Sequence, residues 1–274
     1  MTALVASDLD RTLIYSAGAV QAHGDGGAEL VAVERYLDAD ASWMTAGAAR
    51  AFAQLHRSAV VVPVTTRTPE QWRRIRLPGP PPRYAITANG GILLVDDQPD
   101  RSWAVVVDAA LAKVAGLDEV WRYAGQICRP EWTHTLRNAE GLFCYAVLDR
   151  SRLPAGFLAE AAAWAAGRGW QLSLQGRKLY WVPRSLTKSA AVAEVARRTD
   201  AETAFAAGDS LLDGDLLEAA DAGIAARHGE LVASGWRAAH VAVTTHSGVR
   251  AGAEIVDWLA AQVGDQARLP RRRR

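Results

Sequence analysis

Short apolar runs alternate with helix-like segments at both ends of the chain. The apolar runs are residues 3–7, 59–64, 84–88, 203–207, 222–225 and 241–243. Segments with helical periodicity are residues 45–56, 187–198, 211–220 and 249–263. Continuous apolar runs are typical of strands buried on both faces of a parallel sheet. The alternation therefore predicts an α/β fold, in which a parallel sheet is flanked by helices.

The middle of the chain follows a different pattern. Helices are expected at 108–124 and 154–166, and strands at 142–148, 170–174 and 178–182, with the last two joined by a turn. Because strands and helices do not alternate regularly here, we expect a separate α+β module.

These patterns predict how the chain is divided. Residues 1–89 and 184–265 are expected to form a catalytic core, and residues 90–183 an inserted cap domain. The basic tail at 266–274 is expected to be disordered. The Gly- and Ala-rich segment 13–43 is interpreted as a loop or small hairpin over the end of the first strand, forming an extra flap.

Composition and charge exclude several classes of protein. The chain has 274 residues, half of them hydrophobic, but no apolar run approaches the roughly 18–20 residues of a membrane span. Its N-terminus lacks the basic region of a signal peptide, so a cytoplasmic location is expected. The net charge of +1 is smaller than the contribution of the four arginines at 271–274. The remainder is therefore slightly acidic, which argues against a specific nucleic-acid partner. No membrane partner is expected.

Polar residues follow three of the predicted strands. Asp8, Asp10 and Thr12 follow the first, Thr65 and Thr66 the second, and Asp209 and Asp213 a later one. In open α/β sheets, ligands bind outside the carboxyl ends of the strands. Lys188 stands near the start of the helix that precedes the last of these three strands. Each motif alone also fits a turn, a helix cap or a surface lysine, but their order along the chain favours one catalytic site.

The chemistry that this set favours is phosphoryl transfer through an aspartyl phosphate. Asp8 would be the nucleophile, and Asp10 would protonate the leaving oxygen and later deprotonate the attacking water. Lys188 and Thr65 would donate hydrogen bonds to the phosphoryl oxygens. The expected cofactor is Mg²⁺, which prefers oxygen ligands. Asp8, Asp209 and the Asp10 main-chain carbonyl would bind it, and Asp213 would hold the ion or a water bound to it.

In these motifs the chain resembles the haloacid dehalogenase (HAD) superfamily of phosphohydrolases. Within it, the chain is similar to the Cof-type group, which includes sucrose-phosphate phosphatases. The resemblance extends to Ile86–Gly91, which enters the cap, and to Leu179–Pro183 followed by Lys188. It implies a Rossmann-like HAD core with an inserted C2-type cap and Mg²⁺-dependent hydrolysis of a small phosphomonoester, such as a sugar phosphate. Candidate substrate-binding residues are Arg11, Thr12, Thr66, Arg67, Asn89 and Gly90.

The chain departs from the family pattern at several positions. Arg11 and Ser189 stand where glycine is usual, Leu212 where asparagine is usual, and Thr66 where glycine often follows the threonine. Alternative functions are a phosphomutase or another phosphotransferase, and a catalytically weak binding or regulatory protein. A nucleic-acid module acting through the arginine tail is a further alternative.

Overall fold

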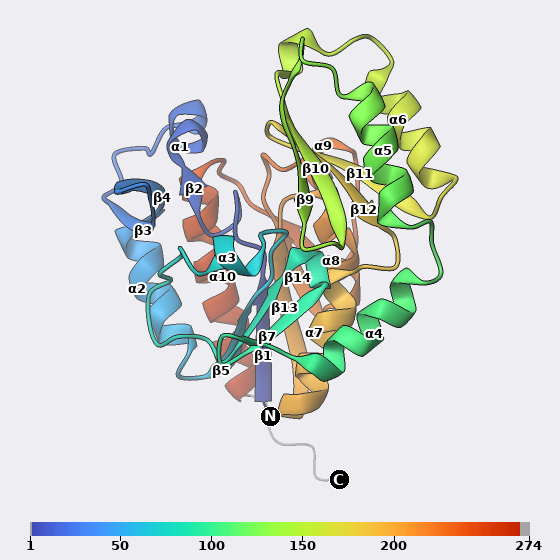
Figure 1. Ribbon diagram of the computed structural model, residues 1–274. Helices are drawn as coiled ribbons and strands as arrows, with labels where there is room; N and C mark the ends of the chain where they lie inside the picture. The colour runs from blue at the N-terminus through green and yellow to red at the C-terminus, as the bar shows by residue number, and fades with distance from the viewer. Residues whose placement is uncertain (1, 269–274) are drawn as a thin grey trace. The chain divides into compact units, whose positions relative to one another are not determined.

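The apolar runs at the two ends of the chain form one parallel sheet in the computed structural model, which describes residues 2–268. Its strand order is β15-β14-β13-β1-β5, and all four pairings are parallel. The strands are β1 (Thr2–Ser7), β5 (Ala59–Pro63), β13 (Ala201–Gly208), β14 (Ala222–Ala225) and β15 (Val241–Val243). The predicted α/β fold is thereby confirmed (Figure 1).

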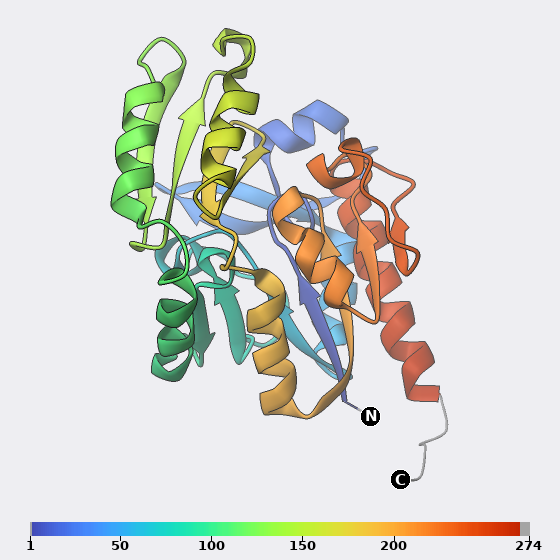
Figure 2. The same cartoon turned by 90° about the vertical axis from the view of Figure 1, so that its right-hand side faces the viewer.

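Helices cover both faces of this sheet (Figure 1), with α2 and α10 on one face and α7 and α8 on the other. The helices of this part of the chain are α2 (Ala46–Leu55), α3 (Pro69–Trp72), α7 (Lys188–Thr199), α8 (Gly214–Ala219), α9 (Glu230–Ala233) and α10 (Val249–Arg268). The Thr45 hydroxyl accepts a hydrogen bond from the Ala48 amide at 3.1 Å and caps α2, a position that threonine favours. Figure 2 shows the length of α10 along the sheet.

Two further small sheets extend the same part of the chain. One contains β6 (Tyr84–Thr87), β7 (Ile92–Val95) and β8 (Gln98–Pro99), and β6 adjoins the end of β5 through a Val64–Ile86 bridge. The other is the flap, which was expected at 13–43 as a loop or small hairpin and instead spans residues 15–45 with three strands and a helix. It contains β2 (Tyr15–Ser16), α1 (Ala17–His23), β3 (Leu30–Tyr36) and β4 (Ala39–Thr45), paired in the order β2-β4-β3.

The chain divides into two compact units. The core unit is Met1–Pro99 with Lys188–Arg274, and the cap unit is Asp100–Thr187. The first boundary differs from the expected 89/90 because β7 and β8 pair with β6 and so stay with the core. The second lies at 187/188 where 183/184 was expected. Residues 266–268 belong to α10 rather than to a tail. The arginines at 271–274 lie outside the described residues.

The cap unit is an α+β module with an antiparallel sheet in the order β11-β12-β10-β9. Its elements are α4 (Arg101–Leu111), α5 (Leu117–Ile127), β9 (Thr133–Ala139), β10 (Phe143–Leu148), α6 (Phe157–Ala166), β11 (Trp170–Gln175) and β12 (Lys178–Pro183). The single helix expected at 108–124 is wrong: two helices flank a turn that ends at Gly116, where the Ala115 carbonyl accepts a hydrogen bond from the Trp170 indole at 2.8 Å. Tyr123 and Trp164 stack between α5 and α6, 3.6 Å apart.

No helix within residues 2–268 combines the length and the apolar character that crossing a membrane requires.

Candidate active site

The strand order places the polar loops next to one another. Strand β1 lies between β13 and β5, so the residues that follow it are flanked on both sides. The Asp8 amide donates to the Ala207 carbonyl at 2.9 Å, and the Val64 amide donates to the Ser7 carbonyl at 2.8 Å. Because the three strands are parallel and in register, Asp8, Asp209 and Thr65 all leave the same edge of the sheet.

Asp8 is buried and held by two side chains. The Lys188 ammonium donates to its Oδ1 at 2.6 Å, and the Thr12 hydroxyl donates to its Oδ2 at 3.2 Å. Thr12, a candidate substrate-binding residue, thus orients the carboxylate of Asp8 in this structure. Burial raises the pKa of Asp8 to about 7; the attraction of Lys188 opposes this rise, and the charge of Asp213 adds to it.

Lys188 is fully buried at the first residue of α7. Its ammonium also donates to Asp213 Oδ1, so it bridges two carboxylates. Burial alone would lower the pKa of Lys188, but the Asp213 and Asp8 carboxylates outweigh it and raise that pKa. The lysine is therefore a fixed positive charge beside Asp8.

Asp213 organises the loop after β13. Its Oδ2 accepts hydrogen bonds from the Asp209 amide at 3.0 Å and from the Ser210 amide and hydroxyl at 2.8 and 2.9 Å. Gly208 permits this closure, because a Cβ there would overlap the Asp213 side chain. With Oδ1 on Lys188, both oxygens of Asp213 have protein partners.

Three carboxylates form a cluster that suits a hard cation. Ligand oxygens of Asp8, Asp209 and Asp213 lie within 4.8 Å of one another, and all three residues are buried. Burial, followed by the charges of Asp8 and Asp213, raises the pKa of Asp209. An all-oxygen, negatively charged set of this kind fits Mg²⁺. The Asp10 side chain is outside this cluster, so a contribution of Asp10 to cation binding would come from its main-chain carbonyl.

The Asp10 carboxylate is engaged by Arg67. Arg67 Nε donates to Asp10 Oδ2 and Nη2 to Asp10 Oδ1, both at 2.7 Å. The other edge of the guanidinium bonds Glu34 of the flap, with Nη1 to Oε1 at 2.6 Å. Arg67, expected to contact substrate, is therefore held between two carboxylates, and their charges raise its pKa against the opposing effect of burial.

Thr65 and the Asn89-Gly90 turn are joined through the backbone. The Asn89 amide donates to the Thr65 carbonyl at 2.9 Å, and the Thr65 hydroxyl accepts from the Arg67 amide at 3.1 Å. Asn89 and Gly90 have φ values of 56° and 93°, a left-handed conformation that asparagine and glycine adopt most easily. The structure thus places Thr65, Thr66, Asn89 and Gly90 in two adjoining loops.

Arg11 turns its side chain onto the carboxylate cluster. Its Nε donates to Asp209 Oδ2 at 3.2 Å, and its Nη2 donates to the His228 carbonyl at 3.1 Å. The residue has a φ of 66°, where an L side chain is strained. The family usually has glycine at this position. Here the Arg11 guanidinium places a positive charge beside Asp209, a candidate metal ligand.

His228 supports Arg11 from the loop after β14. Its Nδ1 accepts from the Gly248 amide at 3.2 Å, so the Nε2 hydrogen donates to the Arg11 carbonyl at 3.1 Å. Burial, and then the charges of Arg11 and His23, lower the pKa of His228 to about 4. The ring is thus neutral at pH 7.

This lowered pKa predicts a loss of stability in acid. Between pH 6.5 and 4 the unfolded chain binds a proton at His228 that the folded chain excludes, so stability falls as the pH falls through this window. With partial solvent access considered, His228 should contribute on the order of 1–2 kcal/mol to that loss. Urea unfolding measures the free energy of unfolding at pH 7 and at pH 4. The decrease between the two pH values should be smaller for His228→Gln than for the wild type. An equal difference would contradict the prediction.

Glu34, Ser42, Ser210 and His228 were missed by sequence reasoning. Ser210 adjoins Asp209, so its place in the loop could have suggested a cap for Asp213. Glu34, Ser42 and His228 lie in no recognisable motif. The structure brings the predicted Asp8, Asp10, Thr12, Lys188, Asp209 and Asp213 together with them.

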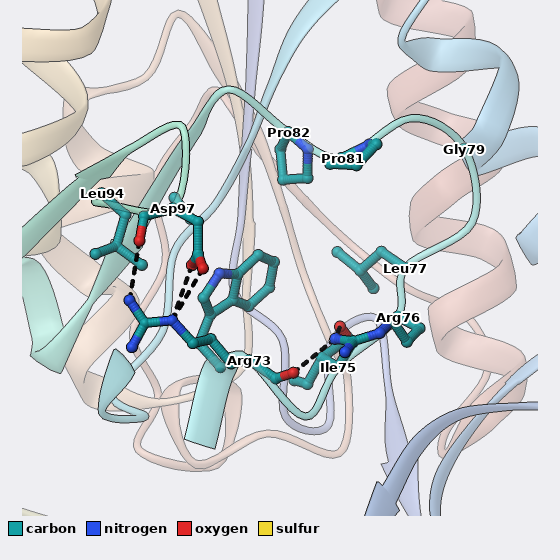
Figure 3. A pocket seen from close by; sticks show the side chains of 11 residues that line it. Arg73, Ile75, Arg76, Leu77, Gly79, Pro81, Pro82, Leu94 and Asp97 are labelled. Atoms are coloured by element: carbon teal, nitrogen blue, oxygen red, sulfur yellow. Dashed lines mark hydrogen bonds and ion pairs between the residues drawn. The ribbon is translucent and has the colours of Figure 1, made fainter. Parts of the chain in front are cut away.

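A cavity of about 440 Å³ also lies in the core unit (Figure 3). It is lined by apolar side chains such as Trp72, Ile75 and Leu94, and Arg73 at its edge is paired with Asp97 at 2.9 Å. None of the clustered carboxylates lines this cavity, so it is separate from the candidate active site.

Comparison with solved structures identifies the fold. A sucrose-phosphatase from Synechocystis, solved with sucrose and phosphate, is 15% identical and aligns over 96% of this chain and 99% of its own with a TM-score of 0.67. A HAD-superfamily phosphatase from Bacteroides thetaiotaomicron is 16% identical over 96% of each chain, with a TM-score of 0.56. A trehalose-6-phosphate phosphatase related protein is 18% identical over 97% of this chain and 100% of its own, with a TM-score of 0.54.

No family model and no curated protein matches the sequence. The structural likeness confirms that the chain has the fold of HAD phosphatases, a Rossmann-like core with an inserted cap, as the motif resemblance implies.

Proposed function

We propose that this protein is a Mg²⁺-dependent phosphatase that hydrolyses a small phosphorylated metabolite through an aspartyl phosphate on Asp8. One observation carries the proposal: a buried carboxylate, Asp8, is bonded to the buried Lys188 at 2.6 Å beside two further buried carboxylates. A binding protein has no need of such a nucleophile, and burying these charges costs stability.

The reaction is assigned to side chains of the core unit. Asp10 enters the cycle as the carboxylic acid. An Asp8 oxygen attacks phosphorus, the ester P–O bond breaks, and the leaving oxygen takes the proton of Asp10, which becomes a carboxylate. Asp10 then accepts a proton from water, whose oxygen attacks phosphorus and breaks the bond to Asp8. Phosphate leaves, and both aspartates return to their starting states. Lys188, already beside Asp8, donates to the phosphoryl oxygens during both steps, with Thr65 as the second proposed donor.

Asp8, Asp209 and the Asp10 carbonyl would hold the metal, with Asp213 holding the ion or its water. When bound, Mg²⁺ would offset the repulsion between the phosphate and the carboxylates.

The substrate class is proposed from the solved structures. One of the proteins described above is named a sucrose-phosphatase and was solved with sucrose and phosphate, and another is named as related to a trehalose-6-phosphate phosphatase. We therefore place sugar phosphates first among the substrates, with Arg11, Thr66, Asn89 and Gly90 as substrate-binding candidates at the carboxyl edge of the sheet.

Phosphate release tests the proposal. Purified protein is offered a panel of phosphorylated sugars and related metabolites, with Mg²⁺ and with EDTA, beside Asp8→Asn. We expect release that needs the metal and disappears in the variant. No release from any compound would contradict the phosphatase function and favour a binding protein. Transfer of the phosphoryl group to a second sugar, rather than to water, would favour a phosphotransferase.

Arg11 is predicted to weaken metal binding. Its guanidinium places a positive charge on Asp209, so removing that charge should tighten binding of Mg²⁺ or Mn²⁺ about five- to tenfold. Arg11→Gly also suits the positive φ at this position. Isothermal titration calorimetry of the two ions measures the effect without any turnover. Arg11→Gln removes the charge without the backbone freedom of glycine. If the charge weakens metal binding, both variants should bind the ions more tightly than the wild type. Weaker binding in both variants would mean that Arg11 orients Asp209 for the ion.

A further inference from the structure

Glu34 is a buried carboxylate that none of the proposed catalytic steps uses. It lies in β3 of the flap, and its side chain is only 7% exposed. Its Oε1 accepts from Arg67 Nη1 at 2.6 Å, and its Oε2 accepts from Arg67 Nη2 at 3.0 Å and from the Ser42 hydroxyl at 2.6 Å. Three donors therefore fix this carboxylate.

Arg67, which Glu34 holds, in turn orients the carboxyl group of Asp10. The guanidinium is planar, and its Nε and Nη2 edge bonds both oxygens of Asp10 at 2.7 Å while the opposite edge bonds Glu34. The Asp10 side chain is 38% exposed, whereas that of Arg67 is 11% exposed. The exposed carboxyl group is thus oriented by a nearly buried guanidinium, which is oriented in turn by a buried carboxylate.

The backbone segments that carry Glu34 and Arg67 are each held by backbone hydrogen bonds that do not involve the two side chains. Glu34 forms an antiparallel bridge with Ile75, and the Arg76 amide donates to the Val33 carbonyl at 2.7 Å. The Arg67 carbonyl accepts from the Ala88 amide at 2.7 Å. Removing the Glu34 carboxylate should therefore release the guanidinium while the two backbone segments keep their places.

We propose that Glu34 is a positioning residue, whose carboxylate fixes the Arg67 guanidinium and thereby aims the Asp10 carboxyl group at the leaving oxygen. This inference rests on the proposed phosphatase function, because it assigns the flap a part in proton donation by Asp10. The flap then acts on the reaction itself as well as covering the strand end.

The dependence on leaving group tests this role. 4-Nitrobenzyl phosphate releases an alkoxide that needs a proton, whereas 4-nitrophenyl phosphate, of similar shape, releases a stabilised anion that does not. Since kcat/KM reports steps up to the formation of the intermediate, misplacing Asp10 should affect the first substrate alone. For Glu34→Ala we expect kcat/KM to fall about tenfold on the benzyl ester and less than about twofold on the phenyl ester.

Further variants separate positioning from folding. Glu34→Gln keeps an oxygen that accepts from Arg67 and should recover part of the loss. Ser42→Ala removes only the hydroxyl bond to Glu34, so it can replace Glu34→Ala in the test if that variant does not fold. It should lower kcat/KM on the benzyl ester relative to the phenyl ester, by less than Glu34→Ala does. Arg35→Ala, on the exposed side of the same strand, should match the wild type on both esters.

Equal losses on the two esters, or no loss on either, would overturn the role of Glu34 while leaving the phosphatase function in place. Absence of Asp8-dependent release by the wild type from both esters and from the panel of phosphorylated sugars would overturn the proposed function and this inference with it. The two failures are therefore distinguishable.

Discussion

Asp8→Asn should abolish turnover and leave the fold intact. The amide has nearly the shape of the carboxylate: its oxygen can still accept from Lys188, and its NH2 group can donate to the Thr12 hydroxyl. It is not a nucleophile toward phosphorus. We expect kcat/KM for phosphate release to fall at least about a thousandfold. The measurement is release under saturating Mg²⁺, with protein concentration fixed by absorbance.

Stability supplies the control for this variant. Asp8 belongs to a cluster of three buried carboxylates, and burial raises the pKa of Asp8 to about 7 because the charged form is costly there. Replacing one of them with a neutral side chain should leave the unfolding midpoint at pH 8 unchanged or raise it, as expected where a functional group is kept at the expense of stability. Normal turnover in this variant would rule out the aspartyl-phosphate route.

Lys188→Ala should lower both stability and rate. The ammonium is fully buried and bonds Asp8 and Asp213, so its loss leaves two buried carboxylates without their cation. We expect the free energy of unfolding to fall by about 3–5 kcal/mol. Turnover should fall about a hundred- to a thousandfold, because a fixed donor to the phosphoryl oxygens is lost. Urea unfolding and phosphate release measure the two effects.

Two variants check this interpretation. Lys188→Met fills much of the volume without the charge, so a similar loss of rate in a folded protein would assign the effect to the ammonium. Lys113→Ala removes an exposed lysine of the cap unit and should change stability by less than about 0.5 kcal/mol. An unchanged rate in Lys188→Met would remove Lys188 from the reaction.

The sequence alone predicts the elements that carry the site. The apolar runs at 3–7, 59–64 and 203–207 become β1, β5 and β13, because strands buried on both faces must be apolar along their length. The polar residues after them then meet at the carboxyl edge, because parallel strands end together. Both statements depend on local patterns and on one rule of sheet geometry, so they need no knowledge of distant contacts.

The flap shows where local patterns are insufficient. Val33 and Glu34 are consecutive and both buried, which breaks the alternation expected of a strand with one buried face. Register shifts on either side of Glu34 produce this arrangement. A bulge depends on pairing with β4 and with Ile75, so the sequence of residues 13–43 suggested only a loop or small hairpin.

What the sequence by itself determined is the α/β fold and the positions of Asp8, Asp10, Lys188, Asp209 and Asp213, because each stands at the end or start of a strongly patterned element. Only the tertiary structure decided the partners of the arginines. Arg67 joins Asp10 to Glu34, and Arg11 reaches Asp209 and His228 across about 200 residues of chain. The partners of long flexible side chains depend on which distant segments the folded backbone brings near them, and no local sequence pattern predicts those partners.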